Sequence, residues 1–125
     1  MQMLFCKANI MVNKPTLCPI ARTASLVGDT WTILIVRDLM SGSKRFGQLQ
    51  ESLGHVSPKT LSQRLKTLEY AHILTREAFA EIPPRVEYSL TDKGRALSSI
   101  IDAMYAFGDQ YLPVEEETLL RAAGD

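Results

Sequence analysis

The stretch Ser57–Tyr70, SPKTLSQRLKTLEY, decides the fold of this chain. Ser57 stands at the N-cap position of a helix, and Pro58 follows at the first helical position, where its missing N–H removes no hydrogen bond. The leucines at 61, 65 and 68 recur at a spacing that places them on one face of a helix. We therefore expect one amphipathic helix of about four turns.

The other face of this helix is polar and almost free of acid. It carries Lys59, Thr60, Ser62, Gln63, Lys66 and Thr67, and the first carboxylate is Glu69. Cations and short hydrogen-bonding side chains on one helix face can lie against a polyanion and contact base edges. The same pattern also fits an ordinary solvent-exposed face, so the neighbouring segments decide between the two interpretations.

A shorter helix and a tight turn precede this stretch. Phe46, Leu49 and Leu53 lie on one face of a predicted helix over Phe46–Leu53, and Gly54 ends it. A helix, a glycine-containing turn and a longer helix with a polar outward face form a helix-turn-helix pattern.

Two further helices are predicted upstream. The first runs from Pro19 to Val27, with Gly28 as a left-handed stop. The second, Trp31–Met40, is capped by Asp29 or Thr30. It is apolar nearly all round, as the buried centre of a small domain would be.

Downstream, the spacing of the apolar residues changes from that of a helix to that of a strand and then back to that of a helix. We expect strands over Thr75–Phe79 and Arg85–Leu90, joined by a wide loop with two prolines. Thr91 then caps one long helix from Asp92 to about Leu112. Its apolar side is too broad for one small domain to cover, so it forms a subunit interface or an exposed patch. The fold class is mainly α with a small β-hairpin (α+β).

Composition indicates one domain and a charge asymmetry. The chain has 125 residues, 46% of them hydrophobic, and no net charge. Between residues 42 and 95, nine basic residues stand against six acidic ones, whereas residues 109–125 hold five acids and one base. We divide the chain into an N-terminal arm (1–16), a domain (17–112) and an acidic tail (113–125). No apolar run reaches the roughly 18 residues of a membrane span, so we expect a cytoplasmic protein without a membrane partner.

The order of these elements is that of a winged helix-turn-helix with flanking N- and C-terminal helices. The chain resembles the HxlR-type transcriptional regulators, relatives of the MarR-type winged-helix repressors. The matching segments are Cys18-Pro19, WTILIVRDL (31–39), GSKRFGQLQESL (42–53), VSPKTLSQRLKTL (56–68) and PPRVEYSLTDKG (83–94). The chain departs from the family pattern at Thr30, at Ala71-His72, where the family often has a glycine-containing turn, and in its longer arm.

The resemblance implies a homodimer that binds double-stranded DNA and dimerises through its N- and C-terminal helices. The second helix of the motif then enters the major groove, and the hairpin contacts the minor groove or its phosphates. The residues implied in DNA contact are Lys44, Arg45, Ser57, Lys59, Thr60, Ser62, Gln63, Lys66 and Arg85. Arg64 has two interpretations. It either faces the DNA with these residues or points back toward the preceding helix or Glu51.

Several residues keep two interpretations. Cys18 begins a helix, where the dipole favours a thiolate, and the resemblance implies an oxidant sensor; the alternative is an inert buried thiol. Cys6 either resolves an oxidised Cys18 or pairs across a dimer. Trp31 belongs to the core or, with Tyr105, lines a pocket for a small-molecule effector.

No catalytic or metal-binding pattern is present. The cysteines and histidines lack metal-ligand spacing, and no phosphate loop, carboxylate pair or nucleophile–base set occurs, so we expect no enzyme, metal or cofactor. The predicted function is sequence-specific DNA binding by a homodimeric transcriptional regulator on a pseudo-palindromic operator, controlled by an effector or by the redox state of Cys18. The alternative is a winged helix that contacts proteins and not DNA.

Overall fold

A computed structural model describes residues 18–115 of the chain, so the arm 1–16 and most of the acidic tail lie outside the described residues. The elements are α2 (Pro19–Val27), α3 (Thr30–Leu39), α4 (Phe46–Leu53), α5 (Pro58–Tyr70), β1 (Leu74–Phe79), β2 (Arg85–Leu90), α6 (Asp92–Arg95) and α7 (Ser98–Tyr111). The mainly α fold with one small hairpin is confirmed. No described helix is long and apolar enough to cross a membrane.

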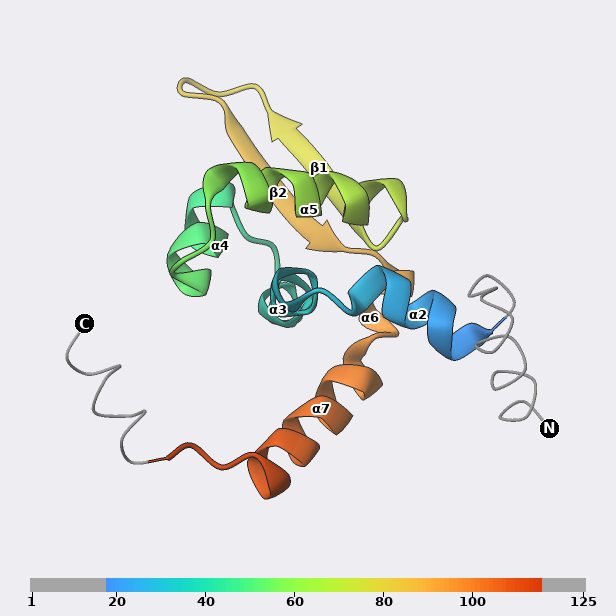
Figure 1. The fold of residues 1–125 in the computed structure, drawn as a ribbon. Helices are drawn as coiled ribbons and strands as arrows, with labels where there is room; N and C mark the ends of the chain where they lie inside the picture. Colours follow the sequence, from blue (N-terminus) through green and yellow to red (C-terminus); the bar gives the residue numbers. More distant parts are fainter. Residues whose placement is uncertain (1–17, 116–125) are drawn as a thin grey trace.

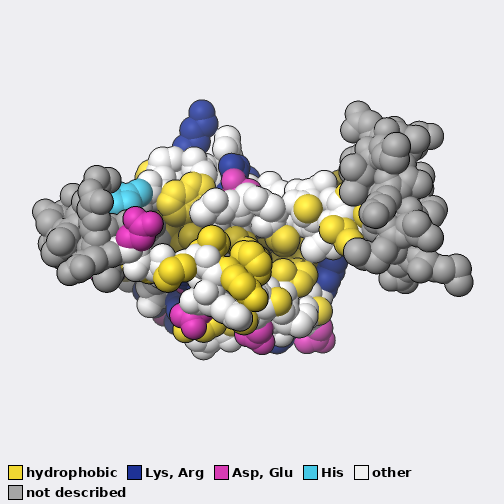
Figure 2. Space-filling view, turned by 60° about the horizontal axis from the view of Figure 1, so that its bottom comes forward, with side chains coloured by type: hydrophobic (Ala, Val, Ile, Leu, Met, Phe, Trp, Pro, Cys, Tyr) yellow, Lys and Arg dark blue, Asp and Glu magenta, His cyan; other side chains and the backbone are white. Residues whose placement is uncertain are grey.

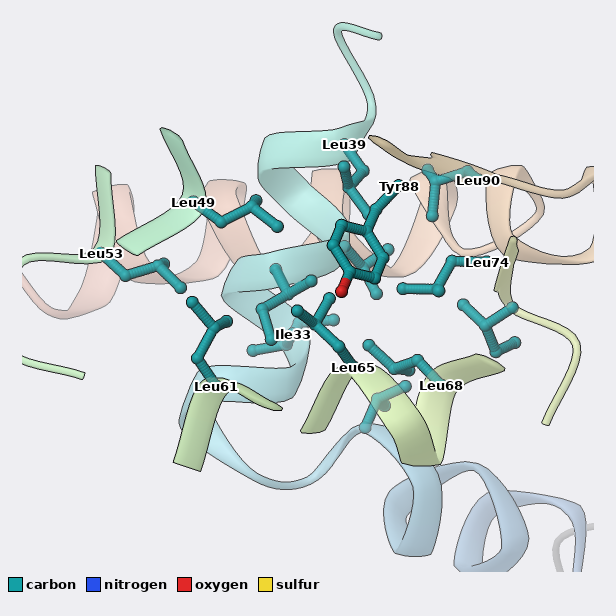
Figure 3. Close-up of a cluster of buried hydrophobic side chains, with 14 of the residues drawn as sticks. Ile33, Leu39, Leu49, Leu53, Leu61, Leu65, Leu68, Leu74, Tyr88 and Leu90 are labelled. Carbon is teal, nitrogen blue, oxygen red and sulfur yellow. The ribbon is translucent and has the colours of Figure 1, made fainter. Parts of the chain in front are cut away.

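Helix α3 is the centre of the molecule. It packs on α2, α4, α5, β2 and α7, and Figure 1 shows it end-on between the other elements. Ile35 and Val36 of α3 are fully buried, as its nearly all-round apolar sequence predicts. The three leucines of α5 point into the same core, with Leu61 toward Leu53 of α4 and Leu68 toward Leu74 of β1 (Figure 3).

The hairpin is a wing built on a third, one-residue strand. β1 and β2 pair antiparallel from Leu74 opposite Leu90 to Phe79 opposite Arg85. Lys44 forms a bridge on the other side of β2, because its N–H donates to Tyr88 O (3.0 Å) and Tyr88 N–H donates to Lys44 O (2.8 Å). We call residues 74–90 the wing. Its base is therefore tied to the segment that leads into α4.

Two expectations about helix ends are wrong. Gly28 has φ −73°, so α2 ends in a right-handed conformation and not a left-handed one. The predicted single helix from Asp92 to Leu112 is broken into α6 and α7 at Ala96-Leu97. Leu97 turns into the core, and its N–H bonds to Gly94 O (3.0 Å), which tightens the chain and redirects the helix.

Helix α5 ends at a left-handed residue that is not glycine. His72 has φ 61°. Its N–H bonds to Glu69 O and the N–H of Ile73 bonds to Leu68 O, the two bonds of a Schellman motif. A side chain is unfavourable in this conformation, and this is the position where the resemblance leads us to expect a glycine-containing turn.

We therefore expect His72→Gly to stabilise the protein. Relief of the left-handed strain outweighs the greater freedom of glycine in the unfolded chain, so the free energy of unfolding should rise by about 0.5–1 kcal/mol. Urea unfolding followed by circular dichroism measures this change. His55→Gly is the matched control, because φ is not positive at His55. Equal effects of the two substitutions would contradict the strain argument.

Candidate nucleic-acid interface

Helices α4 and α5 form the helix-turn-helix, and the cap of α5 is the predicted one. Gly54 takes φ 75° at the end of α4, a conformation that suits glycine. Ser57 Oγ then accepts a hydrogen bond from Thr60 N (3.1 Å) and donates to Thr60 Oγ1 (3.0 Å). The hydroxyl groups of Ser57 and Thr60 are thus both engaged in the cap, and they hold the first turn of α5 in place.

The outward face of α5 is partly to fully exposed along its length. Lys59, Gln63 and Lys66 are exposed, whereas Thr60 and Ser62 are half-buried. Tyr70, seven residues after Gln63 and so on the same face, has 87% of its surface exposed. An exposed aromatic ring beside these residues was not among the sequence predictions. Among the described residues α5 packs on α3 and β1, and Lys59, Gln63 and Lys66 on its outward face stay exposed; Figure 1 shows α5 in front of the hairpin.

Lys44 and Arg45 lie in the link between α3 and α4, where Lys44 pairs with β2 of the wing. Lys44 is half-buried and its Nζ donates to Ser41 Oγ (3.1 Å). Arg45 is exposed and is the N-cap residue of α4, where its backbone N–H donates to Gln48 Oε1 (2.8 Å). Both cations therefore sit at the start of the helix-turn-helix, while DNA contact by either one stays a prediction.

Arg85 is held against the wing by its own neighbours. Its guanidinium carbon lies 4.0 Å from the centre of the Phe79 ring, a cation–π contact. Its Nε is 2.7 Å from Glu81 Oε2, but no hydrogen bond forms there, so we describe the contact as an ion pair. Arg76 on β1 is exposed and was missed in the sequence, where nothing distinguishes it from other strand residues.

Arg64 contacts Asp29, and not the preceding helix or Glu51 as one interpretation of the sequence predicts. Its Nε donates to Asp29 Oδ2 (2.9 Å) and its Nη2 donates to Asp29 Oδ1 (3.3 Å). The guanidinium therefore faces the link between α2 and α3. The hydrogen bond from Arg64 holds the pKa of the Asp29 carboxyl below its ordinary value, and further hydrogen bonds from Thr32 act in the same direction against partial burial.

The remaining candidate residues belong to α3 and α7 or precede α2, outside the helix-turn-helix and the wing. Cys18 is fully buried, precedes α2 and is disulfide-bonded. Trp31 packs against the core. Tyr105 is 75% exposed and borders a cleft between α3 and α7, whose other lining residues are Ile33, Leu34, Arg37, Ile101, Asp102 and Met104. Trp31 does not line this cleft, and an effector site there stays a prediction. Within residues 18–115 no group of three or more metal-ligating side chains is present.

Comparison with known proteins agrees with this arrangement. Residues 26–116 match the family described as HxlR-like helix-turn-helix. An uncharacterized HTH-type transcriptional regulator of Synechocystis, sll1512, is 43% identical over 110 residues, which span 86% of this chain and 82% of the relative. The HTH-type transcriptional regulator YodB of Bacillus subtilis is 42% identical over 97 residues, 77% of this chain and 87% of YodB.

Solved structures extend the likeness to three dimensions. The reduced form of YodB superposes with a TM-score of 0.67 at 41% identity, over 77% of this chain and 95% of that one. The redox regulator HypR in its oxidized form gives a TM-score of 0.73 at 32% identity, over 78% and 100%. YodB has also been solved diamide-treated and quinone-bound.

Proposed function

Because the chain belongs to the HxlR-like helix-turn-helix family, we propose that it binds a pseudo-palindromic DNA operator as a homodimer and so regulates transcription. The observation that carries this proposal is the outward face of α5. It holds three exposed residues able to contact DNA, Lys59, Gln63 and Lys66, while the only carboxylate of the helix is Glu69. Such a regulator works where the DNA is, which in a bacterial cell is the cytoplasm.

In the proposed complex the N-terminal half of α5 enters the major groove. Gln63 and the hydroxyl groups of Thr60 and Ser62 are then close to base edges, while Ser57, Lys59 and Lys66 are close to phosphates. Lys44 and Arg45 would contact the backbone beside α4, and Arg85 would do so from the wing. Since Arg85 is already paired with Glu81 and stacked on Phe79, we expect it to contribute less than the free cations.

Base contacts and phosphate contacts should separate by mutation. We expect Gln63→Ala to change the preferred base at one position of each half-site, with about 1–3 kcal/mol less discrimination there. We expect Lys59→Ala to weaken binding to all sequences several-fold and to lower the slope of log affinity against log salt by about one. Fluorescence anisotropy on duplexes with single base changes measures both effects. If Lys59→Ala changed the base preference and Gln63→Ala weakened binding to all sequences alike, α5 would lie in the groove in a different orientation.

The homodimer is supported by helix α7. None of its 14 residues is buried, and Met104, Phe107 and Tyr111, together with the C-cap residue Leu112, are large, apolar and exposed. Figure 2 shows apolar side chains gathered on this side of the molecule. A helix of this length has marginal stability without tertiary packing. A second copy of α7 would cover the apolar side of the first and would hold two α5 helices about 34 Å apart, one helical turn of DNA.

The test of the function is salt-dependent binding to DNA. Wild-type protein should bind random-sequence duplex at low salt, lose that binding as salt rises, and enrich a pseudo-palindrome from a random duplex pool. Absence of binding to any duplex at low salt would refute the proposal and favour a winged helix that contacts proteins.

We further propose that oxidation of Cys18 controls DNA binding. The support is its place at the start of α2, its disulfide bond in the structure, and the redox-related forms in which YodB and HypR have been solved. Cys18 directly precedes α2, and α2 packs on the central helix α3. A change at Cys18 thereby reaches the core on which α5 rests.

Operator affinity in dithiothreitol and after diamide treatment tests this proposal. Wild type should change affinity between the two conditions, and Cys18→Ser should behave the same in both. If wild-type affinity is indifferent to diamide and to peroxide, Cys18 is a structural cysteine and the redox proposal fails.

A further inference from the structure

The ion pair between Arg64 and Asp29 joins two parts of the molecule that are far apart in sequence. Arg64 belongs to α5, and Asp29 lies between α2 and α3. Within residues 18–115 the other ion pairs join neighbours: Arg37 with Asp38, Arg85 with Glu81, and Arg95 with Asp92. The Arg64–Asp29 pair is therefore the one that connects the outward-facing helix to the central helix through side-chain charge.

Asp29 is a shared acceptor for both helices. Its Oδ2 accepts from Thr32 N (3.0 Å) and Thr32 Oγ1 (3.1 Å), which caps α3, and also from Arg64 Nε (2.9 Å). Its Oδ1 accepts the second guanidinium bond (3.3 Å). A two-pronged arginine–carboxylate contact has a defined orientation, because both groups are planar. The carboxylate thus links one side of α5 to the start of α3 in a defined orientation.

We propose that Asp29 is a specificity-determining positioning residue, which acts through Arg64 on the DNA-reading face of α5. It has two effects. It fixes the rotation at which Gln63 and its neighbours meet the base edges, and it keeps the Arg64 cation away from the DNA backbone. The inference rests on the proposed DNA binding and adds to it a residue that touches no DNA.

The second effect follows from where Arg64 lies on the helix. It sits next to the buried leucines Leu61 and Leu65, at the border of the outward face, and a third of its side chain is exposed. An arginine side chain at this border is long enough to turn outward when its partner is removed. It would then meet phosphates beside the groove, which strengthens binding to every sequence alike.

A purely structural role predicts something different. Both side chains are more than 30% exposed, and ion pairs this exposed contribute little to stability. If loss of the pair only destabilised the fold, binding to preferred and to scrambled duplexes would weaken by one common factor. Positioning instead predicts opposite changes for the two kinds of duplex, and this difference can be measured.

Two variants separate the two effects. Asp29→Ser keeps a good N-cap for α3 but cannot hold the guanidinium, so Arg64 is released. Arg64→Gln leaves Asp29 to cap α3 and removes the cation. Asp92→Asn is the matched control, because it breaks the Arg95–Asp92 pair on α6, away from the helix-turn-helix. Thermal unfolding of each variant checks that it is folded.

The probes are two duplexes of about 30 base pairs, enough for two half-sites one turn apart. One is the duplex that wild-type protein enriches from a random pool, and the other is its scrambled counterpart. Binding to both is measured by fluorescence anisotropy over a range of KCl concentrations.

For Asp29→Ser we expect scrambled-duplex binding to strengthen about threefold or more at low salt, with a salt slope steeper by about one. The ratio of preferred to scrambled affinity should fall about tenfold, as for the loss of one base contact. For Arg64→Gln the ratio should fall similarly, without stronger scrambled binding and without a steeper slope. The control Asp92→Asn should match wild type.

Equal weakening on both duplexes by Asp29→Ser, with the slope unchanged, would overturn the inference in favour of a structural role. If Asp29→Ser does not fold, Arg64→Gln decides, and an unchanged affinity ratio overturns it. A wild type that binds both duplexes equally would remove the specificity on which the inference depends but leave DNA binding intact. A wild type that binds neither duplex at low salt would refute the proposed function itself.

Discussion

Replacing Gly94 with alanine is expected to lower the free energy of unfolding by about 3 kcal/mol. Gly94 is the buried residue of α6, and a Cβ atom there would lie 2.1 Å from the backbone oxygen of Ile73 and 3.0 Å from Leu90 Cδ2. A backbone oxygen at that distance cannot yield as a flexible side chain does. The helix must therefore move away from the base of the wing.

That movement would break a cluster of hydrogen bonds. Ile73 O accepts from Thr91 N (3.0 Å) and Thr91 Oγ1 (3.1 Å), and Thr91 Oγ1 in turn accepts from Gly94 N (3.0 Å) to cap α6. The same hydroxyl lies 2.6 Å from His72 O. Since the wing and α7 both join the core through this corner, its disruption should loosen both.

Urea unfolding followed by the fluorescence of Trp31 measures the effect, at one protein concentration for all variants. Gly47→Ala is the matched control, because a Cβ at Gly47 in α4 meets nothing within 4 Å. This control should gain up to about 1 kcal/mol from the higher helix propensity of alanine. A similar gain at Gly94 would mean that α6 is not in close contact with Ile73.

The parts of the fold that were predictable from sequence are those specified by nearby residues. Helix α5 is the clearest case, because its cap at Ser57, its Pro58 and its leucine spacing all lie within the helix or next to it. The bounds of α4 and of β2 were predicted for the same reason, from Gly54 and from the alternation before Thr91.

The features that were missed depend on contacts between distant segments. The bridge from Lys44 to Tyr88 joins residues that no local pattern relates. The break between α6 and α7 occurs where Leu97 turns into the core, whereas the local sequence there is compatible with one continuous helix. Gly28 is followed at once by the Asp29 cap, and so α2 ends without the left-handed turn that an isolated glycine suggests.

In the candidate site, too, features set by nearby residues were predictable and features set by distant contacts were not. Which residues of α5 face outward follows from helical periodicity, and the exposure of Lys59, Gln63 and Lys66 agrees with it. Which cations are available was not predictable, because pairing decides it. Arg85 forms an ion pair with Glu81 in the wing loop, and Arg64 is bonded to Asp29, 35 residues away.

Replacing Phe107 with glutamate is expected to convert the proposed dimer into monomers and to weaken operator binding at least about 100-fold. Phe107 is 58% exposed in the middle of α7, and its ring packs on Tyr111 with 5.1 Å between the ring centres. In a dimer built on this helix, a carboxylate at position 107 would be buried beside the apolar side chains of the second copy. Burying an unpaired carboxylate costs roughly several kcal/mol, which opposes association of the two copies.

The loss of affinity follows from how a dimer binds. Once one α5 helix occupies its half-site, the second is held near its own half-site at a high effective concentration, and a monomer has no such advantage. Binding of one protomer to random duplex should change little, because Phe107 lies on α7 and not on the helix-turn-helix. The variant should therefore lose operator preference far more than general DNA affinity.

Sedimentation equilibrium and operator titration, performed on the same samples, test both halves of this prediction. Ala106→Glu is the matched control, because it adds the same carboxylate to α7 outside the side that carries Met104, Phe107 and Tyr111. A Phe107→Glu variant that stays dimeric would show that the subunits meet through another surface. A monomeric variant with wild-type operator affinity would show that one α5 helix suffices for recognition, since no second copy would then be needed to explain the binding.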